Sequence, residues 1–133
     1  MTGSADTGPM VAVRQFVEGF NNGDIDLAQA ACTDETSIVD DFPPHEWAGP
    51  GATTRWYREM AAMATESGMS DWSVTLAEPR HITVSGRHAY VVIPADVRWQ
   101  QDGASTGRTA ALTAAIREEA EGWRISAFTW TWD

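Results

Sequence analysis

The side chains best suited to acid–base chemistry stand close together in residues 36–47 of this sequence. Two adjacent carboxylates, Asp40 and Asp41, end a short apolar run, and His45 follows four residues later. A carboxylate at the end of a strand can direct an acid or a base into a cavity, and an imidazole titrates near neutral pH. We therefore interpret Asp40 and Asp41 as candidate acid or base groups and His45 as a candidate proton-transfer partner. The competing interpretation is an ordinary turn, because aspartates before prolines often form turns.

The local sequence indicates how these side chains are positioned. Pro43-Pro44 donates no hydrogen bond to a sheet, so the preceding strand has to end near Asp41. Residues 42–47 then form an extended or turning loop. Because side chains alternate along a strand, Asp41 is expected to cap the loop or face solvent. The simpler alternative for His45 is an exposed loop histidine.

Three helices are predicted in the N-terminal half. An apolar stripe with the spacing i, i+3, i+4 and i+7, typical of a helix, begins at Val13 and ends at Phe20. Gly23 suits a left-handed helix end, and Asp24 suits the first cap of the next helix. The predicted helices span residues 9–22, 25–32 and 51–67, and a strand over residues 36–41 lies between the second and the third.

The C-terminal half carries apolar residues at alternating positions, which predicts strands. Pro79 breaks the first of them, and Gln101-Asp102-Gly103 is typical of a hairpin turn. In the longest strand, one face runs from Ala89 to Trp99 and the other from Tyr90 to Arg98, and the sequence leaves open which face lines a pocket. The predicted strands span residues 72–84, 88–100, 106–118 and 123–132.

Helices first and a meander of strands later are typical of an α+β fold. We predict a single domain over residues 9–133, with residues 1–8 as a disordered lead. The predicted fold is a cone-shaped, curved antiparallel sheet with the three N-terminal helices packed on its concave face. Such an arrangement can enclose a pocket.

The bulk composition excludes several classes of function. The formal net charge of −10 argues against binding to nucleic acid and to anionic membrane surfaces, because both require lysine and arginine. No apolar run of membrane-spanning length occurs, and residues 1–6 lack the features of a secretory signal, so we predict a cytoplasmic protein. The single cysteine, Cys32, is interpreted as a small buried side chain on the second helix. The histidines lack metal-ligand spacing and no cofactor motif occurs, so we predict neither metal nor cofactor.

The sequence holds seven tryptophans, and large rings suit a cavity wall or an interface as well as a core. We expect several apolar and aromatic side chains to contact a small apolar ligand, and the alternative for each is ordinary core packing. Asp96 and Arg98 share a strand face with Tyr90 and could pair inside the cone, although an exposed outer face is the simpler alternative. The candidate substrate-binding residues are Phe16, Phe20, Trp47, Trp56, Tyr57, Met60, Tyr90 and Trp130.

Residues 16–26, 33–41, 89–95 and 122–130 together resemble the nuclear-transport-factor-2-like superfamily, also called SnoaL-like or ketosteroid-isomerase-like. The resemblance covers nearly the whole chain and implies a conical α+β barrel that often forms dimers through its sheet. It places the general base of the isomerases at Asp40. It also places their two oxyanion donors at Phe16 and near Ala114, which carry no hydroxyl or carboxyl group. Ketosteroid isomerisation itself is therefore not expected.

Two kinds of function remain. The first is a cofactor-independent acid–base enzyme of the isomerase, cyclase, dehydratase or epoxide hydrolase type, acting on a small apolar substrate with Asp40 as base and His45 or a tyrosine as donor. The second is a non-catalytic ligand-binding or dimerisation module whose pocket is filled by aromatic side chains. A weaker third is an accessory protein that binds a larger partner through the tryptophan-rich face of its sheet. The resemblance favours a homodimer that forms through this sheet.

Overall fold

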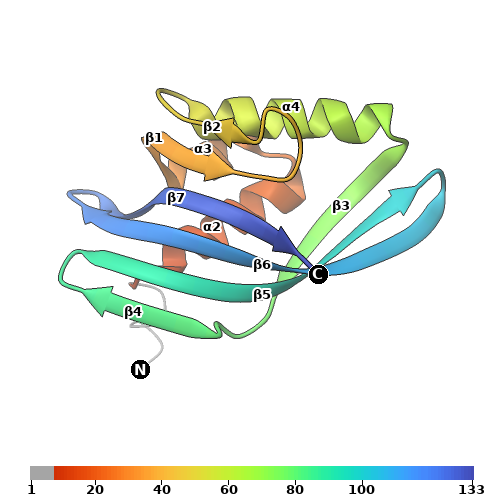
Figure 1. Ribbon diagram of the computed structural model, residues 1–133. Coiled ribbons are helices and arrows are strands. Elements are labelled where there is room, and N and C mark those ends of the chain that lie inside the picture. Colours follow the sequence, from red (N-terminus) through yellow and green to blue (C-terminus); the bar gives the residue numbers. More distant parts are fainter. Residues whose placement is uncertain (1–7) are drawn as a thin grey trace.

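The computed structural model describes residues 8–133, which form three helices and a curved sheet (Figure 1). The predicted lead over residues 1–8 lies, apart from Gly8, outside the described residues. The helices are α2 (Met10–Asn22), α3 (Ile25–Ala30) and α4 (Ala52–Glu66). The strands are β1 (Cys32–Val39), β2 (Glu46–Trp47), β3 (Met69–Leu76), β4 (His81–Ser85), β5 (His88–Gln101), β6 (Ala104–Glu119) and β7 (Gly122–Trp132).

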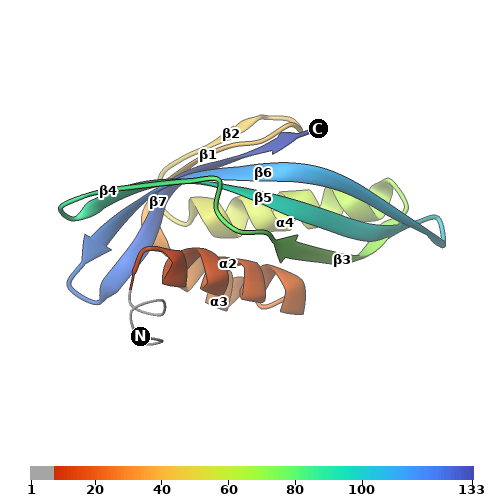
Figure 2. The same cartoon turned by 90° about the horizontal axis from the view of Figure 1, so that it is seen from below.

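The sheet formed by the described residues has seven strands in the order β2-β1-β7-β6-β5-β3, and β4 also pairs with β5. Figures 1 and 2 show the three helices gathered against this curved sheet. The predicted α+β class is therefore confirmed. The sheet is mixed rather than wholly antiparallel, because β1 runs parallel to β7. Hairpin signals govern only strands that are adjacent in sequence, so they carry no information about this pairing of distant strands.

The alternation in β5 decides which side of the sheet faces the helices. The side chains from Ala89 to Trp99 at odd positions are buried, whereas Asp96 and Arg98 on the other face are exposed. The suggested acid–arginine pair inside the cone is therefore wrong, and its alternative, an exposed outer face, is correct. Each buried side chain removes apolar surface from water, which stabilises the packing of the helices on this face.

Several predicted local features are present. Gly23 ends α2 with φ of 67°, a left-handed conformation that suits glycine, and the Asp24 side chain accepts a hydrogen bond from the Leu27 N–H at 3.1 Å. The turn between β5 and β6 contains Asp102 and Gly103 at φ of 51° and 87°. Two strands flank Pro79, and both pair with β5, so the predicted break is confirmed.

Two predictions are wrong, one about the first strand and one about the loop that follows it. The strand β1 begins at Cys32 and ends at Val39, so Cys32 lies on a strand rather than on a helix, although it is buried as expected. Residues 46–47, expected in a loop, form the short strand β2 and pair with Ile38 and Val39. Helix α3 ends early because Cys32 pairs with Ile125 of β7, which is a tertiary contact without a local signal. A two-residue strand is likewise too short to show periodicity.

Helices α2 and α3 approach each other at Gly19. A Cβ atom built there would lie 2.6 Å from the Ala28 backbone nitrogen and 2.8 Å from the Asp24 carbonyl oxygen. We expect Gly19→Ala to lower the free energy of unfolding by about 1–3 kcal/mol, because this clash outweighs the better helix propensity of alanine. Urea denaturation measures the change, with the exposed neighbour Glu18→Ala as the control. Equal stability of Gly19→Ala and the wild type would contradict the predicted clash.

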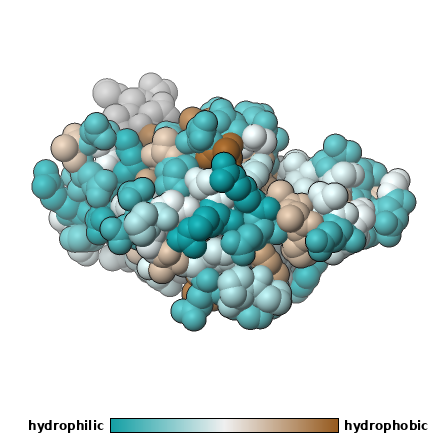
Figure 3. All heavy atoms as spheres, turned by 90° about the horizontal axis from the view of Figure 1, so that it is seen from above, coloured by the Kyte–Doolittle hydropathy of each residue, from teal (hydrophilic) through white to brown (hydrophobic). Residues whose placement is uncertain are grey.

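The face of the molecule that is drawn in Figure 3 is mostly polar. Figure 3 shows this face as predominantly hydrophilic, with hydrophobic atoms confined to small separate areas. Of the helices in residues 8–133, none has the length and apolar character needed to cross a membrane.

Candidate active site

A short loop after β1 holds Asp40 in place. The Asp40 backbone N–H donates to the His45 carbonyl oxygen at 3.1 Å, and the His45 N–H donates to the Phe42 oxygen at 2.8 Å. Nδ1 of His45 lies 3.1 Å from the backbone oxygen of Asp40, and because a carbonyl only accepts, this nitrogen has to carry a proton. The His45 ring is exposed and does not line the cavity described below. The structure therefore places His45 as a loop closure, on the backbone of Asp40 rather than on its carboxylate.

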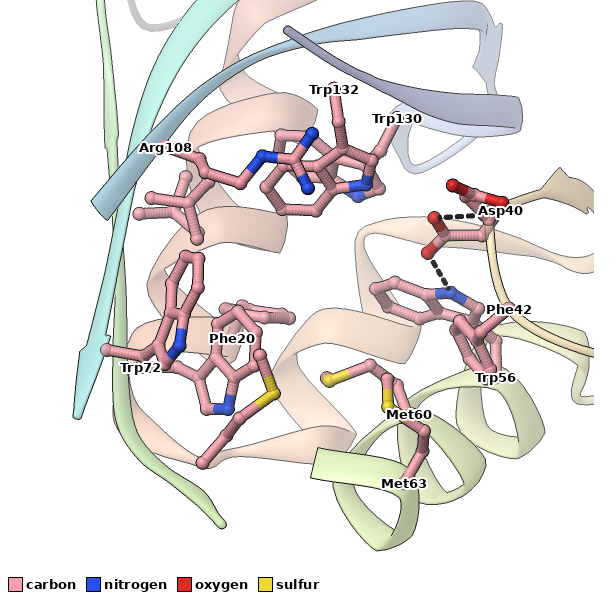
Figure 4. A pocket seen from close by; sticks show the side chains of 15 residues that line it. Phe20, Asp40, Phe42, Trp56, Met60, Met63, Trp72, Arg108, Trp130 and Trp132 are labelled. Carbon is pink, nitrogen blue, oxygen red and sulfur yellow. Dashed lines mark hydrogen bonds between the residues drawn. The ribbon is translucent and has the colours of Figure 1, made fainter. Parts of the chain in front are cut away.

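The carboxylate of Asp40 is buried and hydrogen-bonded through both of its oxygens. The residue is 9% exposed. Trp56 Nε1 donates to Oδ2 at 2.9 Å, and the Asp41 backbone N–H donates to Oδ1 at 2.7 Å (Figure 4). Burial raises the pKa of Asp40 above its ordinary value, and these two hydrogen bonds oppose the rise by stabilising the charged form. The result is a partly desolvated carboxylate with a fixed orientation.

This carboxylate faces a cavity of about 230 Å³ between the helices and the sheet. Its walls are mainly aromatic rings and methionines, and five of the seven tryptophans contribute to them. Three charged residues line it, namely Asp40, Asp41 and Arg108. The fifteen lining residues are Phe20 from α2, Asp40, Asp41 and Phe42 after β1, Trp56, Met60 and Met63 from α4, Met69, Trp72 and Val74 from β3, Val97 and Trp99 from β5, Arg108 from β6, and Trp130 and Trp132 from β7.

Local periodicity explains how these side chains converge. Trp130 and Trp132 are two residues apart on β7, so they point to one face, where their rings stack with centroids 6.5 Å apart. On the opposite wall, Trp72 of β3 stacks on Trp99 of β5 at 5.0 Å. Two stacked pairs of indoles therefore shape a site that suits a flat, apolar molecule.

The predicted binding residues fall into three groups: residues that line the cavity, residues of the core, and the two tyrosines, which are described in the next paragraph. Phe20, Trp56, Met60 and Trp130 line the cavity with Asp40. Phe16 and Trp47 are buried in the core and do not line it; Phe16 packs on Trp56 with ring centroids 6.0 Å apart, and Trp47 packs on Phe42 at 4.9 Å. Both therefore contact residues that line the cavity rather than the cavity itself.

The two tyrosines lie apart from the carboxylate. Tyr57 lines a neighbouring hollow of about 210 Å³, which shares four wall residues with the cavity, and burial raises the pKa of its hydroxyl. Tyr90 is 48% exposed, on the face of β5 opposite the buried alternation. Neither hydroxyl borders the cavity that contains Asp40.

Sequence reasoning missed Arg108, Trp72 and Trp132, and it expected Asp41 to cap the loop or face solvent. Asp41 is exposed and also lines the cavity. A usable signal existed for Arg108, because the predicted turn at Asp102-Gly103 fixes the register in which Arg108 pairs with the buried Val97. No comparable local signal marks Trp72.

Two further observations bear on ligands. The Trp72 indole N–H is buried and has no hydrogen-bond partner. Within residues 8–133, no three His, Cys, Asp or Glu side chains cluster in a way that could hold a metal ion.

The raised pKa of Asp40 predicts a dependence of stability on pH. The folded state holds this proton to higher pH than the unfolded chain, whose ordinary value is 3.8. The stabilisation that Asp40 contributes by binding this proton is therefore complete below pH 3.8, and it is lost as pH rises through the folded-state pKa. We expect the stability of the wild type relative to Asp40→Asn to fall as pH rises above about 3.8. Urea denaturation of both proteins across this range measures it, and a constant difference would contradict it.

Comparison with known proteins places the fold. The SnoaL-like domain family matches residues 10–128 of the chain. No curated protein matches the sequence. Similar solved structures include a candidate dehydratase of the nuclear-transport-factor-2-like family from Streptomyces avermitilis, at 19% identity and a TM-score of 0.76 over 98% of each chain.

Two other solved structures show the same fold. A ketosteroid isomerase-like protein from Erwinia carotovora atroseptica has 17% identity and a TM-score of 0.73, covering 93% of this chain and 92% of its own. A nuclear transport factor 2-like superfamily protein from Salmonella enterica serovar Typhimurium has 16% identity and a TM-score of 0.73, covering 91% and 85%. At these identities the similarity establishes the fold alone.

Proposed function

The chain belongs to the SnoaL-like domain family, and from this premise we propose that it is a cofactor-independent acid–base enzyme acting on a small, mostly apolar molecule. The observation that carries the proposal is the carboxylate of Asp40, which is buried in the wall of an aromatic cavity and held by two N–H donors. Desolvation makes a carboxylate a stronger base, and fixed donors keep it directed toward a bound substrate.

Asp40 is the general base in this proposal. It would take a proton from carbon next to a carbonyl group, or from a hydroxyl or water that attacks the substrate. These steps belong to isomerase, cyclase, dehydratase or epoxide hydrolase chemistry. Phe16 and Ala114 are both buried and neither carries a donor for a substrate oxygen, which supports a reaction other than ketosteroid isomerisation.

His45 has a positioning role in the proposal. Its ring and backbone bond the backbone of Asp40, so it closes the loop that presents the carboxylate. A partner donor for the substrate has to come from the cavity walls instead. The side chains there with N–H groups include Arg108 and Trp72.

A non-catalytic ligand-binding or dimerisation module is the alternative function. Both oxygens of Asp40 already accept hydrogen bonds, an arrangement that also suits a purely structural carboxylate. The expected homodimer through the sheet remains a prediction. Val39 and Tyr90 are 53% and 48% exposed, on the strand faces opposite the buried side chains, and such a contact would cover them.

A thermal-shift screen with polycyclic ketones, epoxides, phenols and lactones begins the test. A ligand that binds only the folded state raises the melting temperature. The proposal expects at least one class to stabilise the wild type, with a different shift in Asp40→Asn, and that class then enters the turnover assay. Stabilisation that is identical in both proteins, with no turnover of the compound, would favour the binding module.

A further inference from the structure

The cavity has polar groups of opposite character in separate places. Asp40 and Asp41 follow β1, whereas Arg108 projects from β6 beside Trp132 (Figure 4). Arg108 is the cationic residue among the fifteen that line the cavity. No ion pair joins Arg108 to Asp40 or Asp41. Among the described residues, the ion pair found within 4.0 Å is that between Arg117 and Glu119. A bound molecule therefore meets acidic groups at one end and a guanidinium at the other.

The guanidinium of Arg108 is held in position with donors to spare. Its Cζ atom lies 5.2 Å from the centroid of the Trp132 ring, and Nη2 donates to the backbone oxygen of Asp133 at 3.0 Å. A guanidinium carries five N–H donors in a planar fork, and stacking on a ring leaves the edge of that fork accessible. Arg108 is exposed, so its remaining donors are accessible.

A second donor in the same cavity has no partner. The Trp72 indole N–H is buried and unpaired, and Figure 4 shows Trp72 across the open space from Asp40. An unpaired buried donor is unfavourable, and an acceptor oxygen on a ligand would relieve it. Trp72 lines both the cavity and the neighbouring hollow, together with Met60 and Met69. Methionine side chains adapt readily, so they can move to admit an acceptor.

We propose that the ligand of this site is a flat, apolar, aromatic carboxylic acid whose carboxylate binds Arg108. The planar fork of arginine matches the two oxygens of a carboxylate. The stacked indoles fit a flat ring system, and the volume of about 230 Å³ limits its size. The Trp72 N–H supplies a further donor to an oxygen on the same molecule.

The charges also set the orientation of this ligand. The carboxylates of Asp40 and Asp41 repel its anionic end, while Arg108 attracts it, so the apolar body lies toward Asp40. This orientation rests on the proposed function, because it brings the reacting carbon, rather than the carboxylate, to the general base. The formal net charge of −10 repels anions at long range, so any preference for a carboxylate has to come from these local donors.

Naphthoic acid and naphthamide test the proposal as matched probes, because they share one ring system and differ in charge. Isothermal titration calorimetry at physiological salt measures both affinities for the wild type and four variants. We expect the wild type to bind naphthoic acid more tightly than naphthamide. Arg108→Gln is expected to weaken binding of the acid by about tenfold and to leave the amide within about twofold, because a hydrogen bond to a charged group is lost. The affinity of Arg108→Lys for naphthoic acid should lie between those of the wild type and Arg108→Gln, since lysine keeps the charge but lacks the planar fork of donors.

Arg58→Gln is the matched control. It removes the same charge from an exposed position on α4 outside the cavity lining, so both affinities should stay unchanged. Melting curves establish that each variant is folded. The proposal is overturned if the wild type binds the amide as tightly as the acid, if it binds neither probe, or if Arg108→Gln weakens both probes equally.

Asp40→Asn separates this inference from the proposed function. Removing the negative charge should leave binding of naphthoic acid as tight as in the wild type or tighter. If the Arg108 variants behave as expected while Asp40→Asn retains turnover, the ligand class stands and the catalytic role of Asp40 fails. If turnover requires Asp40 but the two probes bind equally, the catalytic role stands and the ligand class fails.

Discussion

Asp40→Asn is expected to lower turnover by about 10²- to 10⁴-fold, the usual contribution of a positioned general base. An amide cannot accept a proton at neutral pH, so kcat should fall much more than KM rises. The substrate is the compound class identified by thermal shift, and steady-state kinetics measure the change. Asp40→Glu should also lose activity, because one added methylene displaces the carboxylate from its two N–H donors.

Asp41→Asn is the discriminating partner of this experiment. Asp41 lines the same cavity and carries the same charge, but it is exposed, and we expect its loss to lower turnover by less than about tenfold. The role of Asp40 is refuted if Asp40→Asn keeps wild-type turnover, or if Asp41→Asn is equally damaging. Asparagine at position 40 can accept only one of the two N–H bonds, so circular dichroism of the variant has to accompany the kinetics.

Trp56→Ala is expected to lower the free energy of unfolding by about 3–5 kcal/mol, the range observed for truncation of large buried rings. Trp56 is 1% exposed, and its ring lies 5.1 Å from that of Phe128 and 6.0 Å from that of Phe16. Removing it opens a void in the core and leaves Asp40 without one of its donors. Because a domain of this size is typically stable by only about 5–15 kcal/mol, much of the variant would unfold under mild denaturation.

Urea denaturation measures this loss, and Trp123→Ala is its control. Trp123 is a half-buried tryptophan on β7 that does not line the cavity, so its truncation should be considerably less damaging. Similar losses in the two variants would contradict the central position assigned to Trp56. Trp56→Phe adds a specific readout: losing the indole N–H removes a bond that lowers the pKa of Asp40, so this pKa should rise further. In a pH–rate profile, the limb that reports Asp40 should then move to higher pH.

The sequence by itself determined the order and type of the main elements, because their signals are local. The apolar stripe from Val13 to Phe20, the left-handed end at Gly23 and the turn at Asp102-Gly103 each depend on residues a few positions apart. The resemblance to a known superfamily added the class of fold, which the observed arrangement and the matching family bear out. The resemblance also named Asp40 as the candidate base, and its burial in a cavity is consistent with that interpretation.

Only the tertiary structure decided which side chains share the cavity. The parallel pairing of β1 with β7 joins strands that are far apart in sequence, and no local pattern encodes that contact. The same packing puts Phe16 in the core and Tyr90 on the outer face, and it brings Arg108 and Trp72 into the walls around Asp40. A side chain's type and periodicity indicate whether it is buried, but its neighbours depend on how the whole sheet curves around the helices. The chemistry of this site therefore follows from residues that the sequence separates and the fold brings together.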